Sequence, residues 1–190
     1  MPGSVRSRLI ESAVELIRRN GVPGTAVSGL IDHSGVSRRS IYINFPGGKK
    51  ELIDTSVTAA GGAMGEYIRN LTEGRSPVEA LGDFIDFWKR ILIESDFTAG
   101  CPIAAGAYGG QDVPDARDSA GTVFHEWEII LISSLVDNGV SEDSAPALAT
   151  TVISAIEGAV MLCLAAQELA PLERVQQQME MLIEANTSAP

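Results

Sequence analysis

The 190-residue sequence predicts an all-α fold, in which a three-helix N-terminal unit precedes a larger helical body. Three observations support this prediction. No stretch of any length alternates apolar and polar residues as a half-buried strand would. Apolar residues instead recur every three or four positions through most of the chain. Near the start, two short amphipathic segments flank a Gly-Val corner, the pattern typical of a helix-turn-helix.

The N-terminal unit is expected to open with a helix over residues 4–20. Ser4 is suited to cap its start, and Asn20-Gly21 is a stop signal. Thr25 is the natural N-cap of a short second helix, which ends at a corner where Gly35 fits a position with positive φ. The apolar stripe of the first helix needs a partner, and the two following helices supply it.

The third helix is expected to start after Ser37. Ile41 and Phe45 lie four residues apart and therefore share one face, which we assign to the core. That assignment leaves Arg38, Arg39 and Tyr42 available on the outside. The breaker Pro-Gly-Gly at 46–48 ends the unit, so we expect one domain at 1–48 and a second at 49–190.

The sequence pattern of the body predicts five long helices and one short helix. A long helix runs from Lys49 to about 70, and its glycines at 61, 62 and 65 indicate either close helix packing or a bendable connector. The next helix begins at Ser76-Pro77 and runs to about 95. One short helix near 102–108 is expected within a loop-rich stretch at 96–121. Helices at about 123–138, 144–167 and 171–185 complete the chain.

Charge is distributed unevenly along the chain. The whole sequence carries −11, but residues 1–50 hold eight Lys or Arg against three Asp or Glu, a net charge of +5. The remainder holds six basic and twenty-two acidic residues, a net charge of −16. A basic head on an acidic body predicts that any contact with nucleic acid is confined to the N-terminal end.

Cysteine usage and the absence of a signal-peptide pattern favour the cytoplasm. Cys101 and Cys163 are far apart in the sequence, which favours free thiols over a disulfide. The apolar run at 153–169 is interrupted by Glu157, so we interpret it as a buried or interface helix and not a membrane span. Neither His33 nor His125 has a second ligand at a metal-binding spacing. We expect no metal and no cofactor.

Residues 5–55 resemble the N-terminal domain of the TetR family of transcriptional repressors. The family pattern has a Gly after the first helix, a Thr before the second, a Gly-Val-Ser corner, then a Tyr, a Phe and a Lys. The matching residues are Gly21, Thr25, Gly35-Val36-Ser37, Tyr42, Phe45 and Lys49. The Phe-Pro-Gly-Gly-Lys junction at 45–49 and Gly100-Cys101-Pro102 are similar to the lincomycin-resistance and flavonoid-responsive repressor branch.

The resemblance implies a homodimer that binds a palindromic operator and carries a ligand pocket in its C-terminal domain. Carried over by position, Thr25, Tyr42 and Lys49 would contact phosphates. The groove-facing residues of the recognition helix would be Ser37, Arg38, Arg39 and Ser40. Two positions depart from the family, because Arg39 stands where a small residue is common and Ile43 where an aromatic residue or His is common.

Adjacent helical residues point about 100° apart, so the two arginines do not both read bases. We favour Arg39 for a bidentate contact with guanine and leave Arg38 divided between phosphate and solvent. For dimerisation, the helices near 144–167 and 171–185 have small residues and long apolar stripes that need more partner surface than one chain offers.

The candidates for a ligand cavity are bulky residues of an aromatic-poor body: Phe84, Trp88, Tyr108, Phe124, Trp127 and Met161. Any single one of these residues could instead be an ordinary member of the hydrophobic core. The first functional hypothesis is a repressor released from DNA when a small molecule binds. The alternatives are a ligand-independent activator or architectural DNA binder, and an enzyme. An enzyme would need a nucleophile–base pair or a carboxylate dyad, and the sequence shows neither spacing.

Overall fold

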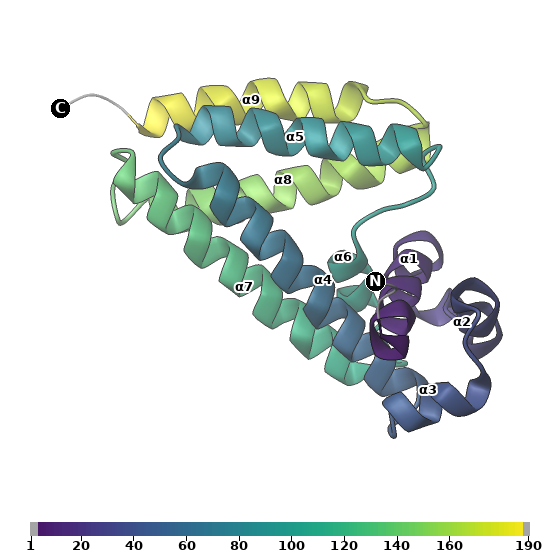
Figure 1. The fold of residues 1–190 in the computed structure, drawn as a ribbon. Helices are drawn as coiled ribbons and strands as arrows, with labels where there is room; N and C mark the ends of the chain where they lie inside the picture. Colours follow the sequence, from purple (N-terminus) through teal and green to yellow (C-terminus); the bar gives the residue numbers. More distant parts are fainter. Residues whose placement is uncertain (1–3, 188–190) are drawn as a thin grey trace. The chain divides into compact units, whose positions relative to one another are not determined.

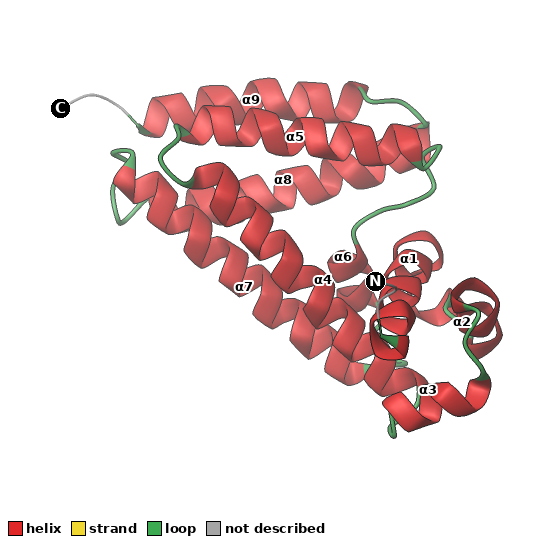
Figure 2. Ribbon diagram, in the orientation of Figure 1, coloured by secondary structure: helices red, strands yellow, loops and turns green. Residues whose placement is uncertain are grey.

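A computed structural model describes residues 4–187 of the chain, and within that range it contains helices and loops but no strand (Figures 1 and 2). The all-α prediction is therefore confirmed. The helices of the described residues are α1 (Val5–Gly24), α2 (Val27–Ser34), α3 (Arg38–Asn44), α4 (Lys49–Thr72), α5 (Pro77–Glu94), α6 (Pro102–Tyr108), α7 (Pro114–Asp137), α8 (Ala145–Ala166) and α9 (Ala170–Asn186).

The chain forms two compact units whose limits differ from the expected domains. The first unit extends to Ala63 and also takes Cys101–Phe124; the second comprises Met64–Gly100 and the chain from His125 onwards. The first unit thus includes α6 and the beginnings of α4 and α7. Close packing explains this extension, because a Cβ added to Gly109 would lie 2.5 Å from the Cβ of Val22 at the end of α1.

The core of the first unit joins α1 to the two short helices. Leu9, Ile17, Leu30, Ile41 and Phe45 are fully buried, so the expected core face of α3 is correct. Two of the expected caps are also correct. The hydroxyls of Ser4 and Ser37 accept hydrogen bonds from the backbone N–H groups of Ser7 and Ser40.

The expected N-cap of the second helix was wrong. Ala26 occupies the N-cap position of α2 without a side-chain hydrogen bond. Gly21 adopts a φ of 68°, which bends α1, and the chain then makes one more turn before Thr25. The Thr25 hydroxyl donates to the Gly21 carbonyl at 2.8 Å. Thr25 therefore closes the turn after α1 and does not open α2.

α7 begins at Pro114, nine residues before the start that the sequence analysis placed at 123. Gly121 and the surrounding small residues made this stretch resemble a loop. The helical spacing is nevertheless present, because Ala116, Ala120 and Val123 are all buried on one face. Proline in the first turn is a common helix start, and that signal was overlooked.

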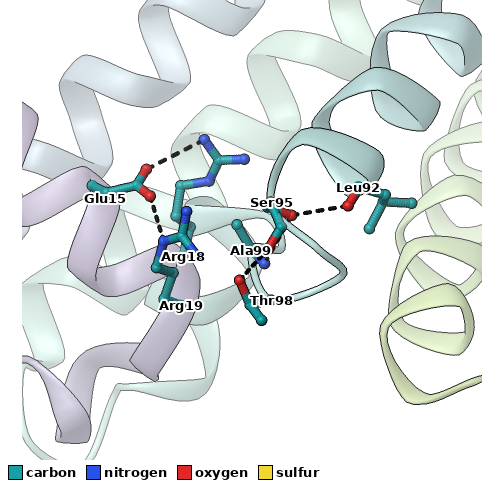
Figure 3. A network of polar contacts seen from close by, with 7 residues as sticks. All are labelled: Glu15, Arg18, Arg19, Leu92, Ser95, Thr98 and Ala99. Atoms are coloured by element: carbon teal, nitrogen blue, oxygen red, sulfur yellow. Dashed lines mark hydrogen bonds and ion pairs between the residues drawn. The ribbon is translucent and has the colours of Figure 1, made fainter. Parts of the chain in front are cut away.

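In the second unit, α5, α8 and α9 lie side by side (Figure 1). Ser76 and Glu79 form a reciprocal capping box at the start of α5, which confirms the cap expected there. The end of α5 is fastened by Ser95, whose hydroxyl donates to the Leu92 carbonyl at 3.2 Å and accepts from the Ala99 backbone N–H at 3.4 Å (Figure 3).

Two of the three α4 glycines are explained by close packing within their own units. A Cβ added to Gly61 would lie 2.4 Å from Val123, and one added to Gly65 would lie 3.4 Å from Trp127. α8 is the one helix in the described residues long and apolar enough to cross a membrane, which on its own is weak evidence for doing so. About 39% of its most apolar window is buried within the chain itself.

Candidate functional site

α3 presents a polar and basic surface from a well-anchored helix. Ile41 is buried against the first unit's core, and Phe45 just after the helix is buried with it. Ser37, Arg38 and Arg39 are exposed at the start of the helix. A buried face directly behind an exposed one fixes the orientation of these side chains relative to the unit.

The exposed face of α3 has two stripes at the i, i+4 spacing. Arg38 lies above Tyr42, which is 47% exposed, and Arg39 lies above Ile43, which is 66% exposed. An isoleucine this exposed gains little from the chain's own core. Ser40 is half-buried, and its hydroxyl lies 3.0 Å from that of Ser37, so it belongs to the cap rather than to the free surface.

The junction after α3 brings Tyr42 next to the start of α4. Gly48 has a φ of +69°, and a Cβ there would lie 3.0 Å from the Tyr42 ring, so the position needs glycine. Glu51 accepts a hydrogen bond from the Gly47 backbone N–H at 2.7 Å. Lys49 is half-buried at the first position of α4, where a cation opposes the helix dipole.

Thr25 does not share this surface. It has no exposed area, and its hydroxyl already donates to Gly21. A contact between this side chain and a phosphate is incompatible with the arrangement in the structure. The remaining residues expected at the interface lie on α3 or its flanks, where Ser37, Arg38, Arg39 and Tyr42 are exposed and Ser40 and Lys49 are half-buried.

Two arginines of α1 donate hydrogen bonds to the C-terminal ends of α2 and α3. The sequence analysis did not predict these contacts. The Arg8 guanidinium donates to the Ser34 carbonyl at 2.6 Å, at the last residue of α2. The Arg6 guanidinium donates to the Asn44 carbonyl at 2.7 Å, at the last residue of α3, and lies 4.3 Å from the centre of the Phe45 ring. Carbonyls at a helix C-terminus have no partner within the helix, and a cation there also favours the helix dipole.

Two further basic residues of α1 pair with one carboxylate. Arg18 Nη1 lies 3.6 Å from Glu15 Oε2, and Arg19 Nε donates a hydrogen bond to Glu15 Oε1 (Figure 3). Their positive charge is thus partly neutralised on their own helix. The basic character counted for residues 1–50 is therefore shared between structural contacts and the surface of α3.

The second unit encloses an apolar cavity of about 70 Å³ between α4, α5, α7, α8 and α9. Its walls are mainly aliphatic, with Phe84 from α5 and Trp127 from α7 as the aromatic members. Three polar side chains reach the lining of the cavity: Thr72, Ser134 and Glu157.

The six candidate ligand residues separate into three groups. Phe84 and Trp127 line the cavity. Trp88 is buried in an aromatic cluster with Phe87, at 5.8 Å between ring centres, and Phe124 belongs to the first unit, so neither lines the cavity.

Tyr108 and Met161 were wrong as cavity residues, because they are 86% and 58% exposed. Tyr108 is the last residue of α6 in the first unit, and Met161 is on the outer face of α8. Residue type identified bulky side chains, but only the packed helices determine which way each one faces.

The described residues contain no cluster suited to metal binding. No group of three His, Cys, Asp or Glu side chains is close enough to hold a metal ion within residues 4–187. Both cysteines are buried and unbonded to each other, and burial raises the pKa of the Cys163 thiol, which makes it a poor nucleophile.

Comparison with known proteins agrees with this geometry. The family model of bacterial regulatory proteins, tetR family, matches residues 9–55, and the model of the transcriptional regulator LmrA/YxaF-like C-terminal domain matches residues 77–178. The second match agrees with the branch that the mid-chain motif indicated.

Individual proteins give the same result over nearly the whole chain. An uncharacterized HTH-type transcriptional regulator of Mycobacterium tuberculosis is 34% identical over 94% of this chain and 93% of its own. A TetR transcriptional regulator from Legionella pneumophila has the same fold, with a TM-score of 0.86 at 21% identity, over 97% of this chain and 100% of its own.

A third similar structure is the TetR family regulator CifR in a complex with 26-base-pair double-strand operator DNA. It has a TM-score of 0.73 at 18% identity and covers 93% of this chain and 97% of its own. The families and relatives matched are transcriptional regulators and not enzymes. The chain therefore belongs to the TetR family of helix-turn-helix transcriptional regulators.

Proposed function

We propose that the protein is a homodimeric repressor that binds a palindromic operator and leaves it when a small molecule fills the cavity of the second unit. The observation that carries the DNA-binding part is the exposed face of α3, which is anchored from behind by Ile41 and fixed at its end by Arg6. The similar CifR structure, solved with operator DNA, supports DNA binding by a protein of this fold. We place this activity in the cytoplasm.

In this proposal, the two stripes of α3 have different tasks. Arg39 and Ile43 share one stripe, so a guanine read by Arg39 is accompanied by an apolar contact between Ile43 and a thymine methyl. Arg38, Tyr42 and Lys49 contact the phosphates, which fix position but carry no sequence information. Ser37 and Ser40 set the start of the helix through the cap that they share.

The operator is found by sequencing the genomic DNA that the full-length protein retains, followed by gel shift on the recovered site. Arg39→Ala is expected to weaken binding by about 1–3 kcal/mol and to relax the preference at one base pair of each half-site. Arg90→Ala is the matched control, because it removes one exposed positive charge from α5. If Arg39→Ala weakens the binding of all DNA sequences equally, Arg39 is a phosphate contact. If the wild-type protein shows no sequence-specific DNA binding, the proposal is refuted.

The outer face of α8 supports dimerisation. Met161 and Leu162 are 58% and 54% exposed there, and Met181 on α9 is 63% exposed. Gly158 lies on the same helix, and an added Cβ would meet nothing within 4 Å in the chain itself. A glycine in mid-helix costs about 1 kcal/mol relative to alanine, and a closely packed second copy would account for it.

Sedimentation of two matched variants tests the dimer. Met161→Glu places a charge on the outer face of α8 and is expected to give monomers that bind the operator poorly. Ile93→Glu introduces the same charge at a residue that is 58% exposed on α5 and is expected to leave the dimer intact. A Met161→Glu protein that remains dimeric would place the interface elsewhere.

The cavity supports the ligand-responsive part of the proposal. An effector that binds one conformation better than the other changes operator affinity by a coupling free energy between the two sites. The direct test is gel shift with and without the compound that binds the cavity. An unchanged operator affinity at saturating compound would remove ligand control and leave a ligand-independent DNA-binding regulator.

A further inference from the structure

The cavity of the second unit has one polar side chain that lacks a hydrogen-bond partner among the described residues. Ser134 is 9% exposed and lines the cavity, and its Oγ makes no hydrogen bond. Helical hydroxyls elsewhere in the chain donate to the carbonyl four residues earlier, as Ser56 does to Leu52 at 2.7 Å. A buried hydroxyl without a partner is unfavourable to the folded protein, so we expect a group from outside the chain to bond to it.

The other two polar side chains of the lining are already engaged within the chain. The Thr72 hydroxyl donates to the carbonyl oxygens of Ile68 and Arg69, each at 3.1 Å. Glu157 also has an interaction within the chain. The rest of the described lining is aliphatic or aromatic. A charged molecule would lose its hydration here without gaining an unengaged counter-charge, so the cavity favours a neutral ligand.

The volume of the cavity limits that ligand to a few heavy atoms. An apolar cavity of about 150 Å³ takes one benzene molecule, so each heavy atom needs roughly 25 Å³. The volume of about 70 Å³ in this protein therefore corresponds to about three or four heavy atoms. Two or three carbons and one oxygen match this space, whereas a ring would enter only if the surrounding helices moved apart.

The cavity is also close to an open polar groove. Residues between 69 and 76, at the end of α4 and the turn after it, and residues between 129 and 138, in the second half of α7, line this groove. Thr72 and Ser134 line both the groove and the cavity. Both side chains are small, so they form a thin partition. A molecule of three or four heavy atoms that enters from the groove therefore meets the Ser134 hydroxyl first.

We propose that the cavity binds an aliphatic alcohol of two or three carbons, with its alkyl chain against the apolar wall and its hydroxyl bonded to Ser134. A serine hydroxyl both donates and accepts, and an alcohol does the same, so the two groups satisfy each other. This inference rests on the proposed function only in treating the ligand of this cavity as the effector. It names the chemical class of that ligand, which the comparisons do not. The binding is reversible and involves no covalent step.

A series of straight-chain alcohols from ethanol to 1-pentanol tests the size of the ligand. Each methylene that still fits should tighten binding about fourfold. Affinity is therefore expected to rise from ethanol to 1-propanol and to fall at 1-butanol and 1-pentanol. Saturation-transfer NMR with the full-length wild-type protein detects such weak ligands directly. The Trp88→Phe protein leaves Trp127 as its one indole, so its fluorescence is a second readout from the cavity wall.

A variant that enlarges the cavity tests whether the alcohols bind inside it. Ile156 is buried and lines the cavity, so Ile156→Val adds space for about one more heavy atom. This change should move the tightest binder from 1-propanol to 1-butanol. Ile85→Val is the matched control, because Ile85 is buried on α5 away from the cavity lining. The same truncation there should leave 1-propanol the tightest binder.

Two adjacent serines of α7 test the hydroxyl contact. Ser134→Ala should weaken the binding of 1-propanol about fivefold and leave that of 1-propanethiol nearly unchanged, because a thiol is a weak hydrogen-bonding group. Ser133→Ala is the matched control, because Ser133 is exposed and lines the groove but not the cavity, and it should change neither affinity. Propylammonium and propionate, which carry a charge on a short chain, should not bind.

Affinity that rises through the whole series to 1-pentanol would overturn the proposal, as would no binding of any alcohol in either readout. Equal losses for Ser134→Ala and Ser133→Ala, or propylammonium binding as tight as that of 1-propanol, would also overturn it. Gel shift with operator in the absence of any probe is a separate measurement. A protein that binds 1-propanol but no operator would refute the proposed function alone, and one that binds operator but no alcohol would refute the ligand class alone.

Discussion

Replacing Arg8 tests whether α1 holds the helix-turn-helix together from behind. Arg8→Met keeps most of the aliphatic stem and removes the guanidinium that donates to the Ser34 carbonyl at 2.6 Å. A hydrogen bond from a charged donor contributes about 1.5–3 kcal/mol, and the partial exposure of this one places it near the lower end. The loss of a favourable charge at the end of α2 acts in the same direction.

The expected cost to the free energy of unfolding is therefore about 1–2 kcal/mol, which corresponds to a fall in Tm of roughly 2–8 °C for a chain of this size. Circular dichroism melts measure it, with Arg38→Met as the control, because Arg38 is exposed and has no ion pair within the described residues. Operator affinity should fall for Arg8→Met at every salt concentration alike. An unchanged Tm together with a salt slope reduced by about one would instead make Arg8 a phosphate contact and refute the structural role.

Two other predictions concern local geometry. Gly48→Ala is expected to destabilise the protein by about 1–2 kcal/mol because Gly48 has a φ of +69° and lies next to the Tyr42 ring. Gly62→Ala, on an open helical surface, should stabilise the protein by up to about 1 kcal/mol. Thermal melts in which both variants lose the same stability would contradict both expectations. Hydrogen bonds from Ser76 lower the pKa of the Glu79 carboxyl, so this contact stabilises the fold above the unfolded-state pKa and is lost as pH falls through the folded-state pKa. Ser76→Ala should return the Glu79 pKa toward its ordinary value in an NMR titration, and an unchanged titration would refute the assignment.

Features that depend on neighbouring residues were predictable from the sequence. Ser37 and Ser76 cap helices because a hydroxyl before a helical stretch meets the free N–H groups of the first turn. Thr25 has the same kind of side chain but sits after Gly21, whose positive φ lets the chain turn once more and gives the hydroxyl another acceptor. The local pattern alone does not distinguish these two outcomes.

Features that depend on distant contacts were not predictable. Arg6 and Arg8 were counted as surface charge because their acceptors lie 38 and 26 residues further along the chain. Tyr108 and Phe84 were equal candidates for the cavity, yet only Phe84 lines it. The partnerless hydroxyl of Ser134 has no signal in the sequence, because a serine in a helix usually satisfies itself within its own turn.

These contacts also change how an acidic protein is expected to bind DNA. Of the eight basic residues in the first fifty, four are engaged within the chain: Arg6, Arg8, Arg18 and Arg19. The other four are Arg38, Arg39, Lys49 and Lys50, which lie on α3 and at the start of α4, and their side chains show neither an ion pair nor a hydrogen bond among the described residues. With Arg39 on guanine, three free cations in each head are left for the phosphates, so a dimer releases about six counterions and log K should fall with log salt at a slope near −5. A slope near −14 would require all eight cations of each head to contact phosphates, which would leave the C-terminal ends of α2 and α3 without Arg8 and Arg6.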